Sequence, residues 1–179
     1  MAPQTSIKLT YEDYAAIPDD GRRHEIIDGE HYVNPAPNLR HQAILARLGV
    51  ALCNHIWERR LGEVYFAPVD VRLIDHVVVQ PDIVFVSAGS THTLTPDYIL
   101  GVPDFVVEIL SSNRSYDERV KYGMYERAGV AEYWIVDPYQ NEVKIFRRSG
   151  AKFVAVPVGE TVTSPFFPDL TIALRDIFE

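Results

Sequence analysis

Two acidic residues stand at or inside short apolar segments of this 179-residue chain. Asp82 directly precedes the apolar residues 83–86, and Glu108 lies within the apolar run 105–110. Short runs rich in Val, Ile and Phe predict buried strands. A buried carboxylate costs free energy unless it is paired or coordinates a metal. If the two strands are neighbours in one sheet, Asp82 and Glu108 form a site for a hard divalent cation. In the simpler alternatives, Asp82 is a turn acid after Pro81, and Glu108 lies exposed at a sheet edge.

Lys121 is the third candidate. On a helix it shares one face with Asp117 and Tyr125, beside an apolar stripe. There the lysine either leans over the end of the preceding strand or forms a surface ion pair with Asp117, which contributes only a few tenths of a kcal/mol.

Glu25 and His41 have two interpretations each. Glu25 precedes Ile26 and Ile27 and points either inward with them or outward. His41 begins a long predicted helix, where its imidazole either meets a phosphate at the positive helix end or caps the helix at the surface.

Composition excludes several classes of protein. The chain is 47% hydrophobic, which indicates one globular domain over residues 1–179. We expect a cytoplasmic protein, because neither a secretory leader nor an apolar run long enough to cross a membrane is visible. A single cysteine, Cys53, is expected in the core. No Cys/His set suits zinc, and no glycine-rich phosphate loop or serine nucleophile motif appears.

The charge balance bears on the partner. A net charge of −8 counts against a polyanionic substrate, because nucleic-acid binders usually carry a basic surface. Bound cations reverse the sign of the charge around a cluster of acids, so a metal site would weaken this objection.

The predicted elements form a mixed α/β fold. We expect a short helix over 11–17, a hairpin over 24–33, a long helix over 41–61 stopped by Gly62, and a loop over 87–103. Between them lie four strand candidates, within residues 64–86. The unit from 104 to 137 has strand–helix–strand order, with its helix over 115–128 stopped by Gly129, which favours parallel strands. The strands 142–146, 152–156 and 170–174 form a C-terminal meander. The expected fold is therefore a mixed sheet flanked by helices.

The order of these motifs resembles a known superfamily. Pro81-Asp82, Glu108 and Lys121 look like the signature of the PD-(D/E)xK nucleases, which have the restriction-endonuclease-like fold. From about residue 10 to 178 the chain resembles a family of small bacterial proteins described as restriction endonucleases, which is abundant in cyanobacteria and was formerly a domain of unknown function. The matching blocks are 23–30, 41–42, 81–86, 106–111 and, most specifically, 125–138.

The chain departs from the superfamily pattern at one informative position. The pattern has a lysine two residues after Glu108, where this chain has Leu110. Related nucleases supply that lysine from the following helix, which here means Lys121. His24 replaces a more usual tyrosine, and residues 112–113 replace a turn that more often contains proline.

The resemblance implies a metal-dependent endonuclease that hydrolyses DNA. Asp82 and Glu108 would bind Mg²⁺, or Mn²⁺ in its place, and the Ile109 carbonyl would add one oxygen ligand. Lys121 would orient the attacking water or stabilise the charge that develops on the phosphate. Glu25 would hold a water or help bind a second metal. The expected assembly is a homodimer. The alternatives are a non-catalytic binding or regulatory module, and an inactive toxin-like or assembly protein, that keep the fold.

Overall fold

Two mixed sheets make up most of the protein. The computed structural model describes residues 8–90, 93–111 and 116–179. The central sheet has the strand order β12-β11-β10-β9-β6-β3, and the second sheet has the order β2-β1-β5-β4-β8-β7. In the central sheet only β9 and β10 pair parallel, while the other neighbours pair antiparallel. The strands of the central sheet are β3 (Gly62–Phe66), β6 (Ile83–Ser87), β9 (Phe105–Ile109), β10 (Glu132–Asp137), β11 (Glu142–Ser149) and β12 (Lys152–Val156).

The remaining elements surround that sheet. The strands of the second sheet are β1 (Arg23–Ile27), β2 (Glu30–Asn34), β4 (Asp70–Ile74), β5 (Val77–Val79), β7 (Thr93–Leu94) and β8 (Tyr98–Leu100). A separate pair joins β13 (Thr161–Val162) to β14 (Ile172–Ala173). The helices are α1 (Tyr11–Ala15), α2 (Leu39–Arg59), a π-helix (Tyr116–Lys121) that continues into α3 (Tyr122–Ala128), and α4 (Leu174–Phe178).

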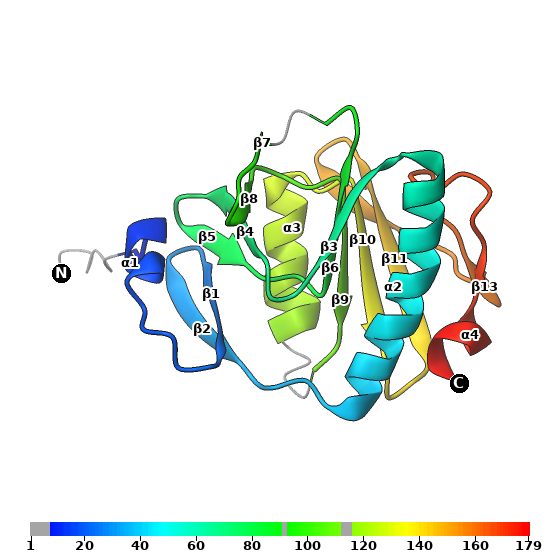
Figure 1. Ribbon diagram of the computed structural model, residues 1–179, viewed down its shortest axis with the longest axis horizontal. Coiled ribbons are helices and arrows are strands. Elements are labelled where there is room, and N and C mark those ends of the chain that lie inside the picture. Colours follow the sequence, from blue (N-terminus) through cyan, green and yellow to red (C-terminus); the bar gives the residue numbers. More distant parts are fainter. Residues whose placement is uncertain (1–7, 91–92, 112–115) are drawn as a thin grey trace.

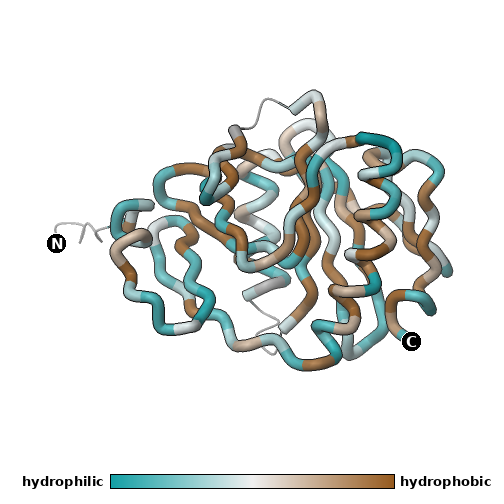
Figure 2. Tube along the Cα trace, in the orientation of Figure 1, coloured by the Kyte–Doolittle hydropathy of each residue, from teal (hydrophilic) through white to brown (hydrophobic). Residues whose placement is uncertain are grey.

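Each face of the central sheet buries a different set of side chains. Side chains alternate along a strand, so Phe85 and Phe105 pack on the face covered by α2, together with Leu48. Val84 and Val106 project to the opposite face, where α3 and the second sheet cover them. Figure 1 shows α2 and α3 on opposite sides of the central strands. In the tube of Figure 2, apolar positions concentrate in those strands and recur along α2. The central sheet is thus covered on one face by α2 and on the other by α3 and the second sheet. Because both faces of its strands are buried, the strands are apolar runs, and these runs were the basis of the strand predictions.

Most of the predicted elements are confirmed, including the mixed α/β fold. The hairpin of β1 and β2 forms, and Thr10 and Asp13 form a capping box at α1. Gly129 ends α3 with φ of 100°. Cys53 is buried. Among the described residues, no helix is both long and apolar enough to cross a membrane.

Three expectations were wrong. The helix α2 is terminated by Arg60 in the left-handed conformation, not by Gly62, which belongs to β3. The predicted loop 87–103 contains β7 and β8. The predicted third strand of the C-terminal meander is instead β14, which pairs with β13, followed by α4. The expected helix start at Ser115 lies outside the described residues.

Candidate active site

The pairing of β6 with β9 sets Asp82 beside Glu108. These strands are antiparallel, with Ile83 opposite Val107. Continuing that register by one residue places Asp82 opposite Glu108, and opposite residues project to the same face of a sheet. The amide of Ile109 also donates a hydrogen bond of 2.8 Å to Asp82 Oδ2. Both acids are only 2% exposed and line one cavity of about 80 Å³.

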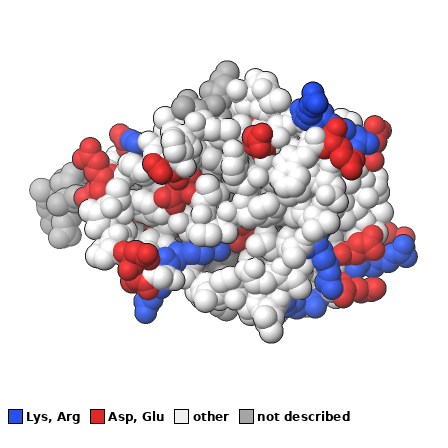
Figure 3. Space-filling model, viewed as in Figure 1, with Lys and Arg blue, Asp and Glu red and all other residues white. Residues whose placement is uncertain are grey.

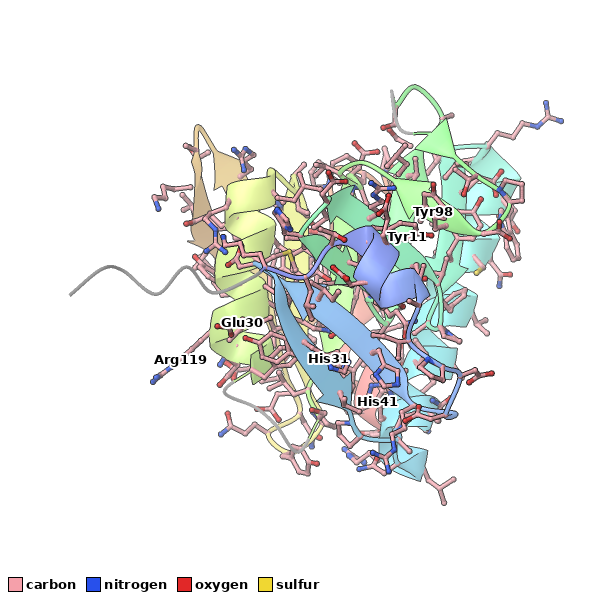
Figure 4. The ribbon with its side chains drawn as sticks, turned by 90° about the vertical axis from the view of Figure 1, so that its left-hand side faces the viewer. Tyr11, Glu30, His31, His41, Tyr98 and Arg119 are labelled. Atoms are coloured by element: carbon pink, nitrogen blue, oxygen red, sulfur yellow. The ribbon has the colours of Figure 1, made fainter. Side chains whose placement is uncertain are left out.

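Lys121 reaches the same place from the helical side. Its ammonium lies 2.9 Å from Glu108 Oε1 and 3.1 Å from Glu25 Oε1, and the residue is 1% exposed. The hydroxyl of Tyr125 donates to the same Glu108 oxygen at 2.7 Å. Arg119, in contrast, extends away from the molecule (Figure 4). Lys121 therefore lies between two carboxylates, on the face of the sheet that Leu110 shares.

Glu25 comes from β1 and is completely buried. It accepts hydrogen bonds from Tyr116 Oη at 2.6 Å, Asn34 Nδ2 at 2.6 Å and the Gln80 amide at 2.7 Å. Burial acts to raise the pKa of Glu25, but the charge of Lys121 and these hydrogen bonds outweigh it and hold the pKa below its usual value. Glu25 therefore lies in the site as an ionised carboxylate.

Two further basic side chains contact Asp82. Arg23 Nη1 lies 3.1 Å from Asp82 Oδ1, and His41 Nε2 lies 3.1 Å from Asp82 Oδ2. Burial acts to raise the pKa of Asp82, whereas the hydrogen bond and charge of His41 and the charge of Arg23 lower it, and the net shift is downward. His41 is 5% exposed, so the interpretation as a surface cap is wrong, and the side-chain cap of α2 is Asn38. Arg23 was missed, although it stands two residues before Glu25 and so shares its face of the strand.

The side chains that the helical segment contributes to the site are positioned by an unusual local geometry. Tyr116 and Lys121 are five residues apart, the hydrogen-bond spacing of a π-helix, and Tyr125 follows four residues later in α3. All three contact Glu25 or Glu108. Because Lys121 and Tyr125 were predicted to share one face of a helix, the sequence could have indicated Tyr125 as a further residue of the site. The side chain of Asp117 lies outside the described part of the structure.

The donor groups fit a hard divalent cation. Three carboxylates, Glu25, Asp82 and Glu108, contact two fixed cations, Arg23 and Lys121, so the carboxylates outnumber these cations by one. Among the described residues, no three His, Cys, Asp or Glu side chains form a ligand set. Mg²⁺ needs only one or two carboxylates, since it keeps several waters. Asp82, Glu108 and Ile109 all line the cavity, and oxygen donors suit Mg²⁺ and Mn²⁺.

Comparison with known proteins identifies the family and the fold of the chain. A family model named Uma2, described as "Putative restriction endonuclease", matches residues 11–175. The chain belongs to the Uma2 family, which confirms the resemblance at the family level.

One solved structure is similar over nearly the whole chain. It is described as a "putative nuclease belonging to DUF820 from Anabaena variabilis ATCC 29413", and it matches with a TM-score of 0.78 at 20% identity, covering 95% of this chain and 97% of that one. At this identity the match shows the fold. No curated protein matches the chain.

Proposed function

We propose that the protein is a metal-dependent endonuclease that hydrolyses DNA phosphodiester bonds, with Mg²⁺ as its ion and Mn²⁺ as a substitute. The observation that carries the proposal is that Asp82, directly before β6, and Glu108, on the neighbouring β9, line one cavity, with the buried ammonium of Lys121 beside Glu108. The descriptions of the Uma2 family and of the Anabaena protein support a nuclease.

Each side chain then has a defined role. Asp82, Glu108 and the Ile109 carbonyl would hold Mg²⁺, which when bound polarises the scissile phosphate and makes a nearby water more acidic. Lys121 stabilises the negative charge that grows on the phosphate oxygens during the reaction. Glu25 also contacts the Lys121 ammonium and helps to keep it in place.

A cleavage assay with isosteric variants tests the proposal. Alanine would remove a buried carboxylate that partly buried Arg23 or buried Lys121 contacts and would destabilise the fold, so Asp82→Asn and Glu108→Gln are the better variants. Cleavage with Mg²⁺ or Mn²⁺ should fall by about 100-fold or more in both variants. Ca²⁺ should not support cleavage by the wild type, because it accepts looser geometry and aligns the attacking water poorly.

The matched control is Asp75→Asn, which removes an acid whose side chain is 69% exposed and should keep full activity. Single-stranded, duplex and branched DNA should all be assayed. Equal cleavage by the wild type and both site variants would indicate a contaminating nuclease and contradict the proposal.

A metal-free binding module is the alternative function. It is favoured by the contacts of Arg23 and His41, which engage both oxygens of Asp82. A Mn²⁺ titration distinguishes the two functions. The endonuclease requires that the wild type binds Mn²⁺ and that Asp82→Asn does not, whereas the metal-free module requires no Mn²⁺ binding.

A further inference from the structure

The cavity above the acids has room for one small group. Its volume of about 80 Å³ corresponds to two or three waters, at roughly 30 Å³ for each water in the liquid. Asp82, Glu108 and Lys121 on its inner side are buried, whereas the residues of the linker 35–38 and Tyr139 are exposed. This space suits a single phosphate group and excludes a base pair, so the bases flanking that phosphate must meet the exposed side.

Tyr139 provides a flat apolar surface on that side. It is 55% exposed and lies in the turn between β10 and β11. Its amide donates to Asp137 Oδ1 at 2.8 Å, which fixes the turn. Arg40, near the N-terminus of α2, also stabilises the turn that contains Tyr139. Its guanidinium donates hydrogen bonds to the Pro138 carbonyl at 2.8 Å and to Asn141 Oδ1 at 2.6 Å. Figure 1 shows this turn beside the start of α2. Because the backbone is already fixed, little ordering is required when a ligand stacks on the ring.

The linker adds apolar side chains to the exposed side, next to the polar Asn34 and Asn38. The linker contributes Pro35, Ala36 and Pro37 to the cavity lining. Leu39, which follows the lining residue Asn38, is 90% exposed. On the face shown in Figure 3, charged side chains lie near the ends and also at a few places in the middle, with uncharged surface between them. Apolar side chains of this kind contact bases or separate them from their neighbours.

Charge argues against recognition of a duplex through many phosphates. The protein carries a net charge of −8, and the lining cations Arg23 and Lys121 are already paired with Asp82 and Glu108. Duplex binding through the backbone needs many unpaired cations, since each phosphate contact releases counterions. Base stacking on an aromatic ring does not depend on net charge and contributes about 1–3 kcal/mol per base.

We infer that Tyr139 stacks on an unpaired nucleobase next to the scissile phosphate, so that the substrate is DNA with unpaired nucleotides at the point of cleavage. A paired base cannot offer its face to the ring, because its neighbours in the helix cover it. The inference rests on the proposed function, since it names the DNA form that the same site accepts.

Binding of fluorescent DNA, followed by anisotropy in Ca²⁺ so that no cleavage is expected, tests the inference. One sequence is prepared as a single strand, as a full duplex and as a duplex with an unpaired bubble. The wild type should bind the single strand and the bubble more tightly than the duplex. Tyr139→Ala should weaken binding of those two forms by about 5- to 150-fold and Tyr139→Trp should preserve it.

The matched control is Trp57→Ala. Trp57 is an aromatic residue with almost the same exposure, 57%, near the other end of α2 and outside the lining of the cavity. Its removal should leave DNA binding unchanged. The wild type should also show a shallow dependence of affinity on salt, because few phosphates are contacted.

The outcomes separate this inference from the proposed function. Cleavage and unpaired-strand binding that both survive in Tyr139→Ala would overturn the stacking role and leave the endonuclease standing. Single-strand binding through Tyr139 without cleavage by the wild type under any metal would support the stacking and contradict the endonuclease. Tighter binding of the duplex, or binding of no DNA form, would overturn the inference.

Discussion

The carboxylate of Asp82 is shared between two basic side chains. Arg23 holds one oxygen and His41 the other, while the Ile109 amide adds a third donor. Such a buried acid is well stabilised without a metal. Any ion that ligates Asp82 therefore competes with these contacts, and Arg23, whose side chain is 20% exposed, is the more easily displaced.

Removal of that competitor should strengthen metal binding. A hydrogen bond to a charged group contributes about 1.5–3 kcal/mol, so Arg23→Gln should raise the affinity for Mn²⁺ by roughly 10-fold or more. Calorimetric titration measures the change. Arg22→Gln is the control, because Arg22 is 68% exposed and contacts only Asp20 among the described ion pairs. Weaker binding in Arg23→Gln would show that Arg23 holds Asp82 in the conformation that the metal needs.

At the scale of elements, the C-terminus of α2 carries local strain. Arg60 has φ of 54°, a conformation that costs an L-residue other than glycine about 1–2 kcal/mol. Arg60→Gly should therefore raise the free energy of unfolding by about 0.5–1 kcal/mol, after the greater freedom of glycine in the unfolded chain is subtracted.

Urea unfolding measures this effect. The paired control is Arg59→Gly, at the last residue of the helix, which should lower the free energy of unfolding by up to about 1 kcal/mol. Two changes of the same sign would show that the backbone conformation at residue 60 does not decide the outcome.

The same helix end shows why boundaries were predicted less well than elements. Glycine commonly ends helices, which favoured Gly62, but at that position β3 needs it: a Cβ atom would lie 2.2 Å from the Val86 carbonyl oxygen. The strands β7 and β8 have only two and three residues, too few to show a period. The apolar runs of β6 and β9 were long enough, and so the positions of Asp82 and Glu108 followed from them. Contacts between residues far apart in sequence, such as Arg23 with Asp82, left no local pattern.

For the whole molecule, stability should fall in acid. The pKa values of Glu25 and Asp82 are lowered in the folded protein, from ordinary values of 4.5 and 3.8. A carboxylate with a lowered pKa contributes stability above its unfolded-state value and loses it as the pH falls through the folded value. The free energy of unfolding should therefore be level near neutral pH and fall below about pH 4.5.

The variant Glu25→Gln measures how much of the loss of stability in acid is due to Glu25. The variant should be less stable at pH 7, because Lys121 loses a partner, and its stability should decline less steeply in acid. Glu142→Gln, at an exposed position of β11, should follow the wild type in parallel. Urea unfolding between pH 7 and pH 3 provides the measurement. A Glu25→Gln curve parallel to that of the wild type would contradict the assignment of Glu25 as an ionised, paired group.

The expected homodimer stays a prediction. A monomer has a mass of 20.3 kDa, and sedimentation equilibrium would distinguish it from a species of twice that mass.

The π-helix between Tyr116 and Lys121 has a consequence for how the gene can change. A π-turn holds one residue more than an α-turn, so loss of a single codon within it would leave a regular helix of nearly the same length. That regular helix would turn Tyr116 by about 100° relative to Lys121, since each α-helical residue advances by that angle. One of the two would leave Glu25, although every chemically important residue would still be encoded. Relatives that lack this codon would thus keep all the important site residues in their sequences, although these side chains would no longer be aligned in the site.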